Sequence, residues 1–318
     1  MAIFKSNEFV AAGQAVQAEV VRGLENRPYV LIARYFDSSN PDLYKPTGSY
    51  NVQLRNHGAQ IGVDTDGLVI EPHDEDKMLG FIRRQFDSGK TTGFMALYPL
   101  PDRVRHAIFD LLRERPELDT DDLLGLRMDA PTARSMVAVA NLCLNGDPEQ
   151  GGADYYTGKR LDELSTLDLP EGWSADNMRF GGRGFLTNAP LIRMLGKQGI
   201  QVPDEYIATE NTPGRLVDLP NPALVFTATP NAEQIKDGDI PDGSVIIDAG
   251  FGRRDGVTYG NTEMSVGDRK SVLWTPPVRG IGPGSTLFFY DNLLEAAGVP
   301  RHTIPALGAV GISGATDH

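Results

Sequence analysis

A segment rich in proline and glycine, TPPVRGIGPGST at residues 275–286, has the composition of a ligand-binding loop. It comes after an apolar run, SVIIDAGF at 244–251, and leads into a run of helical character, LFFYDNLLEAAG at 287–298. Prolines stiffen such a loop, and glycines let its backbone approach a ligand closely. An ordinary strand-to-helix connection has the same ingredients, so the segment needs support from elsewhere in the chain.

A second candidate site is a glycine turn formed by Gly181, Gly182 and Gly184. The turn follows a short apolar run and precedes a helical stretch at 190–196. Backbone amides at the start of a helix can hold a pyrophosphate group. The spacing is not G-x-G-x-x-G, so a plain tight turn remains an equal alternative.

The composition describes a globular chain and excludes several classes of function. The 318 residues suit two modest domains or one large one. A net charge of −13 argues against nucleic-acid binding, which needs a basic face. No apolar run is long enough to span a membrane and no secretory signal is visible, so a cytoplasmic location is expected.

Metal and disulfide chemistry are not expected. Cys143 is the only cysteine, which excludes an intrachain disulfide and a cysteine-based zinc site. The five histidines show no metal-ligand spacing. We therefore predict no metal site and place Cys143 in the core.

The elements that must position these loops alternate along the chain. Helices are expected at residues 9–24, 50–61, 74–87, 104–113, 131–144 and 285–297, and strands at 29–35, 68–70 and 93–98. A second alternating series is expected from 178 to 274. Such alternation implies parallel β-α-β units and an α/β fold. Residues 145–176 have weak periodicity and are interpreted as an insertion, which we expect to be a passive surface excursion, with a lid or a dimer contact as alternatives.

Several segments, taken in chain order, resemble signatures of the methylenetetrahydrofolate dehydrogenase/cyclohydrolase family. GFMALYPLP at 93–101 is similar to the family's GILVQLPLP, and RPELDTDD at 115–122 to its PEKDVDG. GGRGFLTNAP at 181–190 is similar to GRSxxVGxP, and TPPVRGIGPGST to TPVPGGVGPMT. IIDAGF at 246–251 and YGN at 259–261 are similar to VIDVGI and VGD. The ordered set covers residues 28–300.

This resemblance implies two α/β domains flanking a cleft. Residues 1–130 would form an N-terminal catalytic, folate-binding domain, completed by a C-terminal helical segment at 285–318. Residues 131–284 would form a Rossmann-like NAD(P)-binding domain with the insertion near 145–176. The family also implies a homodimer through the cofactor domain.

The resemblance implies where a dinucleotide binds. The family carries HSxT after the second strand of the cofactor domain, and this chain has Thr209-Glu210-Asn211-Thr212 there. A carboxylate at Glu210 would accept hydrogen bonds from ribose hydroxyls and repel the 2′-phosphate of NADP. We therefore predict NAD over NADP, a preference that Arg183 or Arg215 could reverse. The predicted cofactor-binding residues are Gly182, Arg183, Gly184, Thr187, Thr209, Glu210, Thr229, Gly260, Thr275 and Pro277.

The folate half departs from the family pattern. The family has a tyrosine and a lysine one helical turn apart, which align with Tyr50 and Leu54, and a glutamine that aligns with Leu97. Asp121 matches the family aspartate that binds the pterin amino groups. Arg55 could replace the lysine only if the helix slipped by one residue, a rotation of about 100°. The predicted substrate-binding residues are Tyr50, Leu54, Leu97, Pro99, Asp121 and Pro283, with Tyr50 and Asp121 as the catalytic pair.

These departures indicate which of the two family reactions, dehydrogenation or hydrolysis, this chain is expected to catalyse. Hydride loss from 5,10-methylenetetrahydrofolate needs positioning rather than proton transfer. Hydrolysis of the methenyl product benefits from a positioned acid–base group, worth about 10²–10⁴-fold. The expected function is NAD(P)-dependent methylenetetrahydrofolate dehydrogenase with weak or absent cyclohydrolase activity. Alternatives are an oxidoreductase of the same fold with another substrate, or a non-catalytic folate- or nucleotide-binding protein.

Overall fold

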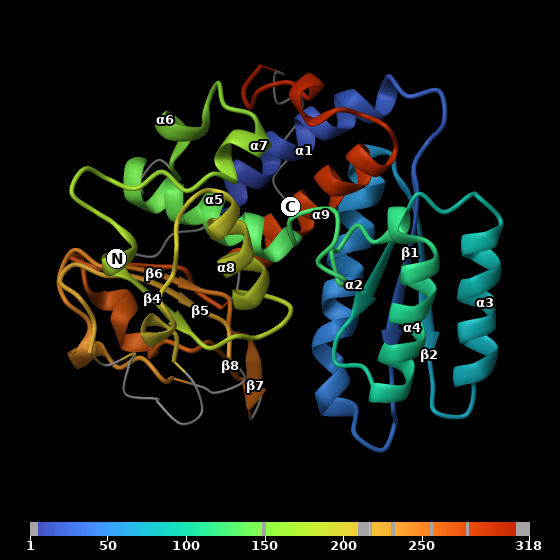
Figure 1. The fold of residues 1–318 in the computed structure, drawn as a ribbon, viewed down its shortest axis with the longest axis horizontal. Helices are drawn as coiled ribbons and strands as arrows, with labels where there is room; N and C mark the ends of the chain where they lie inside the picture. Colours follow the sequence, from blue (N-terminus) through green and yellow to red (C-terminus); the bar gives the residue numbers. More distant parts are fainter. Residues whose placement is uncertain are drawn as a thin grey trace. The chain divides into compact units, whose positions relative to one another are not determined.

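The chain forms two compact units in a computed structural model. The structure describes residues 6–147, 151–208, 216, 218–229, 233–254, 257–277 and 280–309. The N-terminal unit comprises residues 14–131 and 289–305, and the central unit comprises 1–13, 132–288 and 306–318. Each unit contains a parallel sheet with helices (Figure 1), which confirms the predicted α/β class. The domain boundaries drawn from the sequence stay a prediction.

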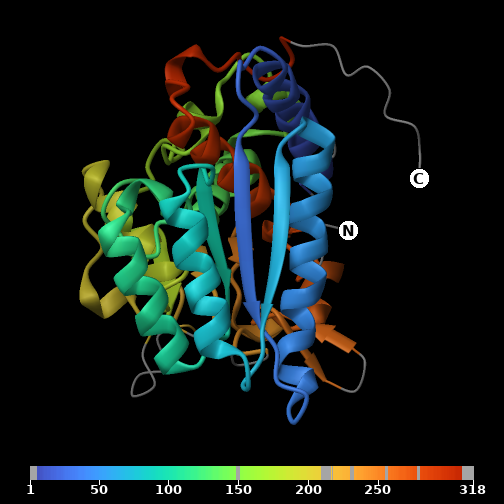
Figure 2. The same cartoon turned by 90° about the vertical axis from the view of Figure 1, so that its right-hand side faces the viewer.

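The N-terminal unit is built on a three-stranded parallel sheet. Its order is β2 (Asp64–Ile70), β1 (Tyr29–Tyr35) and β3 (Gly93–Leu97), so β1 is central (Figure 2). Alternate residues of β1, namely Leu31, Ala33 and Tyr35, join one buried cluster. Because strand side chains alternate, the residues between them lie on the opposite face.

Two helices supply apolar side chains to the cluster on the first face. In α3 (Glu75–Asp87) the buried residues are Ile82 and Phe86. In α4 (Asp102–Glu114) they are Val104, Ile108, Leu111 and Leu112, spaced three to four apart along one helical stripe.

The opposite face packs against α2 (Pro41–Ile61) and α9 (Ile281–Ala296). A β-carbon at Gly93 would lie 2.6 Å from Leu293 of α9. The Tyr290 hydroxyl of α9 donates to the Leu54 carbonyl of α2 at 2.8 Å. His57 stacks on the Tyr290 ring with centroids 4.9 Å apart. These contacts fix the rotation of α2 about its axis.

Both helices begin earlier than expected. Helix α2 starts at Pro41 rather than near residue 50, with Pro41 in the first turn, where a missing N–H is tolerated, and Pro46 inside the helix. It ends at Gly62, whose φ of +85° forms a left-handed cap. Helix α9 likewise accommodates Pro283 in its first turn.

The central unit contains a four-stranded parallel sheet. Its order is β4 (Met178–Gly181), β5 (Leu224–Thr227), β6 (Val245–Asp248) and β9 (Leu273–Trp274). A separate antiparallel pair joins β7 (Gly252–Arg254) to β8 (Val257–Tyr259). The unit also contains α5 (Pro131–Asn145) and α8 (Asn188–Lys197), together with the first turns of α1 (Asn7–Arg22).

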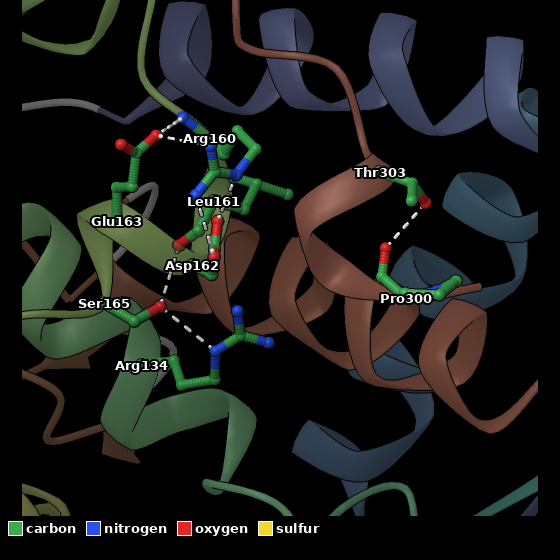
Figure 3. Close-up of polar contacts among 8 residues, drawn as sticks. All are labelled: Arg134, Arg160, Leu161, Asp162, Glu163, Ser165, Pro300 and Thr303. Atoms are coloured by element: carbon green, nitrogen blue, oxygen red, sulfur yellow. Dashed lines mark hydrogen bonds and ion pairs between the residues drawn. The ribbon is translucent and has the colours of Figure 1, made fainter. Parts of the chain in front are cut away.

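The insertion contributes to the core of the central unit rather than lying passively on its surface. It carries α6 (Ala153–Tyr156) and α7 (Leu161–Leu164), and both leucines of α7 are buried. The Asn141 amide of α5 donates to the carbonyls of Leu164, at 3.0 Å, and Thr166, at 2.7 Å. Figure 3 shows the buried Arg134 of α5 directed at Ser165, with Nε donating to Oγ at 3.1 Å.

Short 3-10 turns complete the connections. They are η1 (Pro116–Leu118), η3 (Ala175–Asn177), η4 (Asp204–Tyr206), η6 (Asp237–Asp239), η7 (Met264–Asp268) and η8 (Arg301–Thr303). Among the helices that the structure describes, none combines the length and the apolar character needed to cross a bilayer.

Candidate functional site

Two neighbouring carboxylates beside β3 have different roles. Asp119 is buried and accepts hydrogen bonds from the backbone amides of Leu123 and Leu124, both at 2.9 Å, so it holds the following turn. Asp121 is partly exposed to solvent. Its carboxylate has no hydrogen bond or ion pair within the described residues. Burial raises the pKa of Asp121 well above the usual range, and the charges of Asp119 and Asp122 add to the rise. Asp121 is therefore poised to receive a ligand with hydrogen-bond donors.

Tyr98 lies beside Asp121 and was not expected from the sequence. It follows β3, and the peptide bond between Tyr98 and Pro99 is cis. Burial and then the charge of Asp121 raise the pKa of Tyr98. The signal was present in GFMALYPLP, where tyrosine replaces a leucine of the signature it resembles.

The positions aligned with the family's lysine and glutamine are apolar and closed to solvent. Leu54 of α2 is 0% exposed and Leu97 of β3 is 4% exposed. Arg55 is exposed, because the rotation of α2 directs Leu54 rather than Arg55 to the inner face. Tyr50, one turn before Leu54, is partly buried on α2.

Two further predicted substrate residues are prolines. Pro99 is partly buried after β3, and Pro283 is partly buried in the first turn of α9. Pro99 belongs to the N-terminal unit and Pro283 to the central unit. The roles of all predicted substrate residues stay predictions.

The backbone geometry of the turn in the central unit requires glycine at two positions. Gly181 ends β4, where a β-carbon would lie 2.4 Å from Oγ1 of Thr227. Gly182 has a φ of +109°, which residues with side chains rarely adopt, and its carbonyl accepts a hydrogen bond from Asn188 at 3.0 Å. Thr187 precedes the first turn of α8, which contains no acidic side chain. Such a turn before a helix fits the pyrophosphate of a dinucleotide.

Of the charged side chains expected near this turn, the structure describes Arg183 but not Glu210 or Arg215. Arg183 pairs with Asp204, and both side chains are largely exposed. A surface pair of this kind contributes only about 0–1 kcal/mol, so it does not prevent Arg183 from meeting a ligand. Thr209, Glu210 and Arg215 lie outside the described residues.

A buried carboxylate joins the loops at the carboxyl edge of the sheet. Asp248 ends β6, and its oxygens accept the backbone amides of Gly250 and Thr262, both at 2.8 Å. Its own amide donates to Oγ1 of Thr275 at 2.7 Å. Gly260 packs against this carboxylate so closely that a β-carbon would lie 2.5 Å from Oδ2. Sequence reasoning missed Asp248, although it stands in the quoted IIDAGF segment.

Asn261 extends this network to β5. Its Oδ1 accepts from the Thr227 hydroxyl at 3.0 Å and from the Thr229 amide at 2.8 Å, while its Nδ2 donates to the Thr229 carbonyl at 2.9 Å. The structure thus brings Thr229, Gly260 and Thr275 to the edge where ligands bind parallel sheets. Pro277 follows Thr275 and is partly buried.

The chain has relatives among known proteins, although no family model matches it. It is 24% identical over 243 residues to the bifunctional protein FolD of Lactobacillus gasseri, covering 72% of this chain and 74% of the relative. It is 29% identical over 239 residues to the FolD protein of Acinetobacter baumannii, covering 74% and 77%.

Solved structures share the fold over nearly the whole chain. The 5,10-methylenetetrahydrofolate dehydrogenase of Bombyx mori superposes with a TM-score of 0.66 at 20% identity, covering 94% of this chain and 98% of that one. The dehydrogenase-cyclohydrolase of Trypanosoma brucei, complexed with NADP and an inhibitor, gives 0.68 at 17% identity, covering 92% and 96%. The NAD-dependent dehydrogenase of Saccharomyces cerevisiae gives 0.56 at 16%, covering 90% and 94%.

The predicted preference for NAD over NADP is contradicted by these comparisons. The Trypanosoma brucei protein of the same fold holds NADP, whereas the Saccharomyces cerevisiae protein is NAD-dependent, so the fold itself accommodates either dinucleotide. The preference rests on Glu210, and that residue lies outside the described part of the chain. The assignment of NAD is therefore withdrawn.

The predicted family resemblance and the predicted α/β fold class agree with the comparisons. The FolD relatives match over about three quarters of their own length, and the ordered motifs lie on a shared two-unit α/β fold. These relatives and the shared fold support the resemblance to the methylenetetrahydrofolate dehydrogenase/cyclohydrolase family that the ordered motifs indicate.

Proposed function

We propose that this protein is a nicotinamide-dinucleotide-dependent 5,10-methylenetetrahydrofolate dehydrogenase with weak or absent cyclohydrolase activity. The observation that carries the proposal is the pair Leu54 and Leu97. Both side chains are buried where the family pattern has an acid–base lysine and its glutamine. A leucine can neither hold nor move a proton, so hydrolysis loses its assistance.

The dehydrogenase step makes smaller demands on the protein. Nitrogen lone pairs of the folate stabilise the cation left by hydride departure, so the protein must only position the substrate. Tyr50 would stack on the pterin, and the ionised Asp121 would accept hydrogen bonds from its amino groups. Because the pKa of Asp121 is raised, substrate binding should strengthen as the pH rises through that pKa.

The central unit would hold the dinucleotide. The cofactor supplies the hydride acceptor when it is bound. The turn at Gly182 and Gly184, with the start of α8, would receive the pyrophosphate. The network around Asp248 would hold Thr229 and Thr275 beside the nicotinamide end.

An absorbance assay tests the proposal. 5,10-Methylenetetrahydrofolate is supplied with either NAD or NADP, and reduced dinucleotide and methenyl product are followed separately. Accumulation of the methenyl product is expected with at least one dinucleotide. Hydrolysis to the formyl product as fast as dinucleotide reduction would sink the monofunctional assignment.

The same assay separates the alternatives. Dinucleotide binding without tetrahydrofolate binding would favour an oxidoreductase acting on another substrate, an alternative motivated by the altered folate site and the short segment after Asp121. Binding of both ligands without turnover would favour a non-catalytic role. The implied homodimer is part of the proposal, and light scattering of the purified chain tests it.

A further inference from the structure

One charged side chain interrupts the central strand of the N-terminal sheet. Strand β1 reads YVLIARY, and Arg34 is its only charged residue. The strand pairs with β2 on one side and β3 on the other, and Arg34 is partly buried. Placing a guanidinium there costs desolvation that an apolar residue would avoid. A residue that breaks a packing rule in this way is expected at a functional position.

The strand alternation places Arg34 on the face that carries the proposed substrate residues. Leu31, Ala33 and Tyr35 face the cluster covered by α3 and α4, so Arg34 lies on the other face, covered by α2 and α9. Its cross-strand partner is Leu97, about 5 Å away along the hydrogen-bonding direction.

The guanidinium lies toward the carboxyl end of the strand and contacts an aromatic ring rather than a carboxylate. Its Cζ is 5.7 Å from the ring centre of Phe36, the residue that follows β1. Within the described residues, no carboxylate forms an ion pair with Arg34. Ligands of parallel sheets bind at this edge. A cation there, without an acidic partner, is suited to an electron-rich ligand group.

We propose that Arg34 is a substrate-binding residue whose guanidinium donates hydrogen bonds to the ring carbonyl oxygen of the pterin. This inference rests on the proposed function. A pterin ring carries amino donors, which suit Asp121, and a carbonyl acceptor, which neither Leu54 nor Leu97 can satisfy. An arginine supplies that donor but cannot release its proton, so it restores binding and orientation without acid–base catalysis.

Two variants of Arg34 and one control variant test this role. Arg34→Met keeps much of the apolar length and removes the charge, and Arg34→Lys keeps the charge without the planar fork. Arg55→Gln is the control, because Arg55 is an exposed cation next to Leu54. The Michaelis constants for folate and dinucleotide, kcat, and the midpoint of thermal unfolding are measured for each.

The expected result is selective. Arg34→Met should raise the folate KM by about 10–100-fold, as expected for losing a charge-assisted hydrogen bond, with a smaller change in kcat. The dinucleotide KM should not change, and Arg34→Lys should fall between wild type and Arg34→Met. The Arg34→Met protein should unfold at an equal or higher temperature, because a partly buried charge has been removed.

Fragment binding identifies the group that Arg34 contacts. 6-Methyltetrahydropterin carries the ring carbonyl but no glutamate, whereas p-aminobenzoylglutamate carries the carboxylates but no pterin. Arg34→Met should weaken binding of the first fragment and leave the second unchanged. Weakening of only the second would overturn the assignment to the ring oxygen.

Two outcomes separate this inference from the proposed function. An active wild type together with an Arg34→Met protein of unchanged folate KM would overturn the role of Arg34 alone. A wild type that reduces neither dinucleotide with folate would remove the proposed function itself. If Arg34→Met unfolds at a much lower temperature and keeps its folate KM, Arg34 is a structural residue.

Discussion

Acid should destabilise the N-terminal unit through one buried histidine. His57 of α2 is 3% exposed and stacks on Tyr290 of α9. Its Nδ1 accepts from Gln14 at 3.0 Å, and its Nε2 donates to Gln17 at 2.9 Å. Gln14 is held in this orientation because its Nε2 also donates to Gln60 at 2.9 Å. The environment therefore fits a neutral imidazole.

The size of the loss in the free energy of unfolding follows from the pKa of His57. Burial lowers the pKa of His57 from 6.5 to about 3. Above pH 6.5 the ring is neutral in both the folded and the unfolded chain, so it contributes no pH dependence. Between pH 6.5 and 3 the unfolded chain binds a proton that the folded chain does not, and the free energy of unfolding falls as the pH falls. At about 1.4 kcal/mol per pH unit, the loss from this group is about 3 kcal/mol at pH 4.

The assay compares the wild type with a His57→Phe variant, whose ring keeps the stacking but cannot titrate. Urea unfolding followed by circular dichroism at pH 7 and pH 4 gives the free energy of unfolding of each protein. His57→Phe is expected to be less stable at pH 7, because two glutamines lose a partner, but to lose about 3 kcal/mol less than wild type on acidification. Equal losses in both proteins would refute the neutral buried histidine.

Three further predictions concern the candidate site. The double variant Leu54→Lys/Leu97→Gln should raise cyclohydrolase activity at least tenfold by restoring an acid–base pair, measured as the decay of methenyl product. Asp121→Asn should raise the folate KM and flatten its decrease with rising pH, because the group that must ionise is gone; a wild-type profile in this variant would count against the role of Asp121. Gly181→Ala should lower the free energy of unfolding by about 1–3 kcal/mol and weaken dinucleotide binding, since its β-carbon would lie 2.4 Å from Oγ1 of Thr227; fluorescence titration with dinucleotide checks the second effect.

Much of the scaffold could be predicted because it depends on local patterns. Strands β1 and β3 are short apolar runs bounded by turn residues, and both were located within a residue or two. Helix α2 begins well before residue 50, although Pro46 and Gly48 disfavour a helix locally and Pro46 lies inside it. Strand β2 was shortened because its first residues, DTDG, are polar and glycine-rich at a sheet edge.

The candidate site was predictable only where one segment defines it. The glycine turn at Gly181 and Gly182 is contiguous in the sequence, and its backbone requirements can be anticipated. The network of Asp248 joins residues more than ten positions apart, so no local sequence pattern predicts it. Arg34 carried a signal, a charge inside an apolar strand, but its meaning depends on which face of the sheet it occupies.

The two units hold their candidate binding residues in place in different ways. In the central unit, polar side chains at the sheet edge are joined by hydrogen bonds around Asp248 and Asn261, and such a satisfied network rigidifies the loops. In the N-terminal unit, Leu54 and Leu97 are buried in place of a polar pair. A lone glutamine there would leave a buried amide unsatisfied, so the two replacements are consistent only together. A side-chain hydrogen-bond donor for the substrate must then come from another element, and Arg34, across the register from Leu97, is placed to supply it. A hydride transfer requires orientation and tolerates this exchange, whereas hydrolysis, which requires a proton at a ring nitrogen, does not.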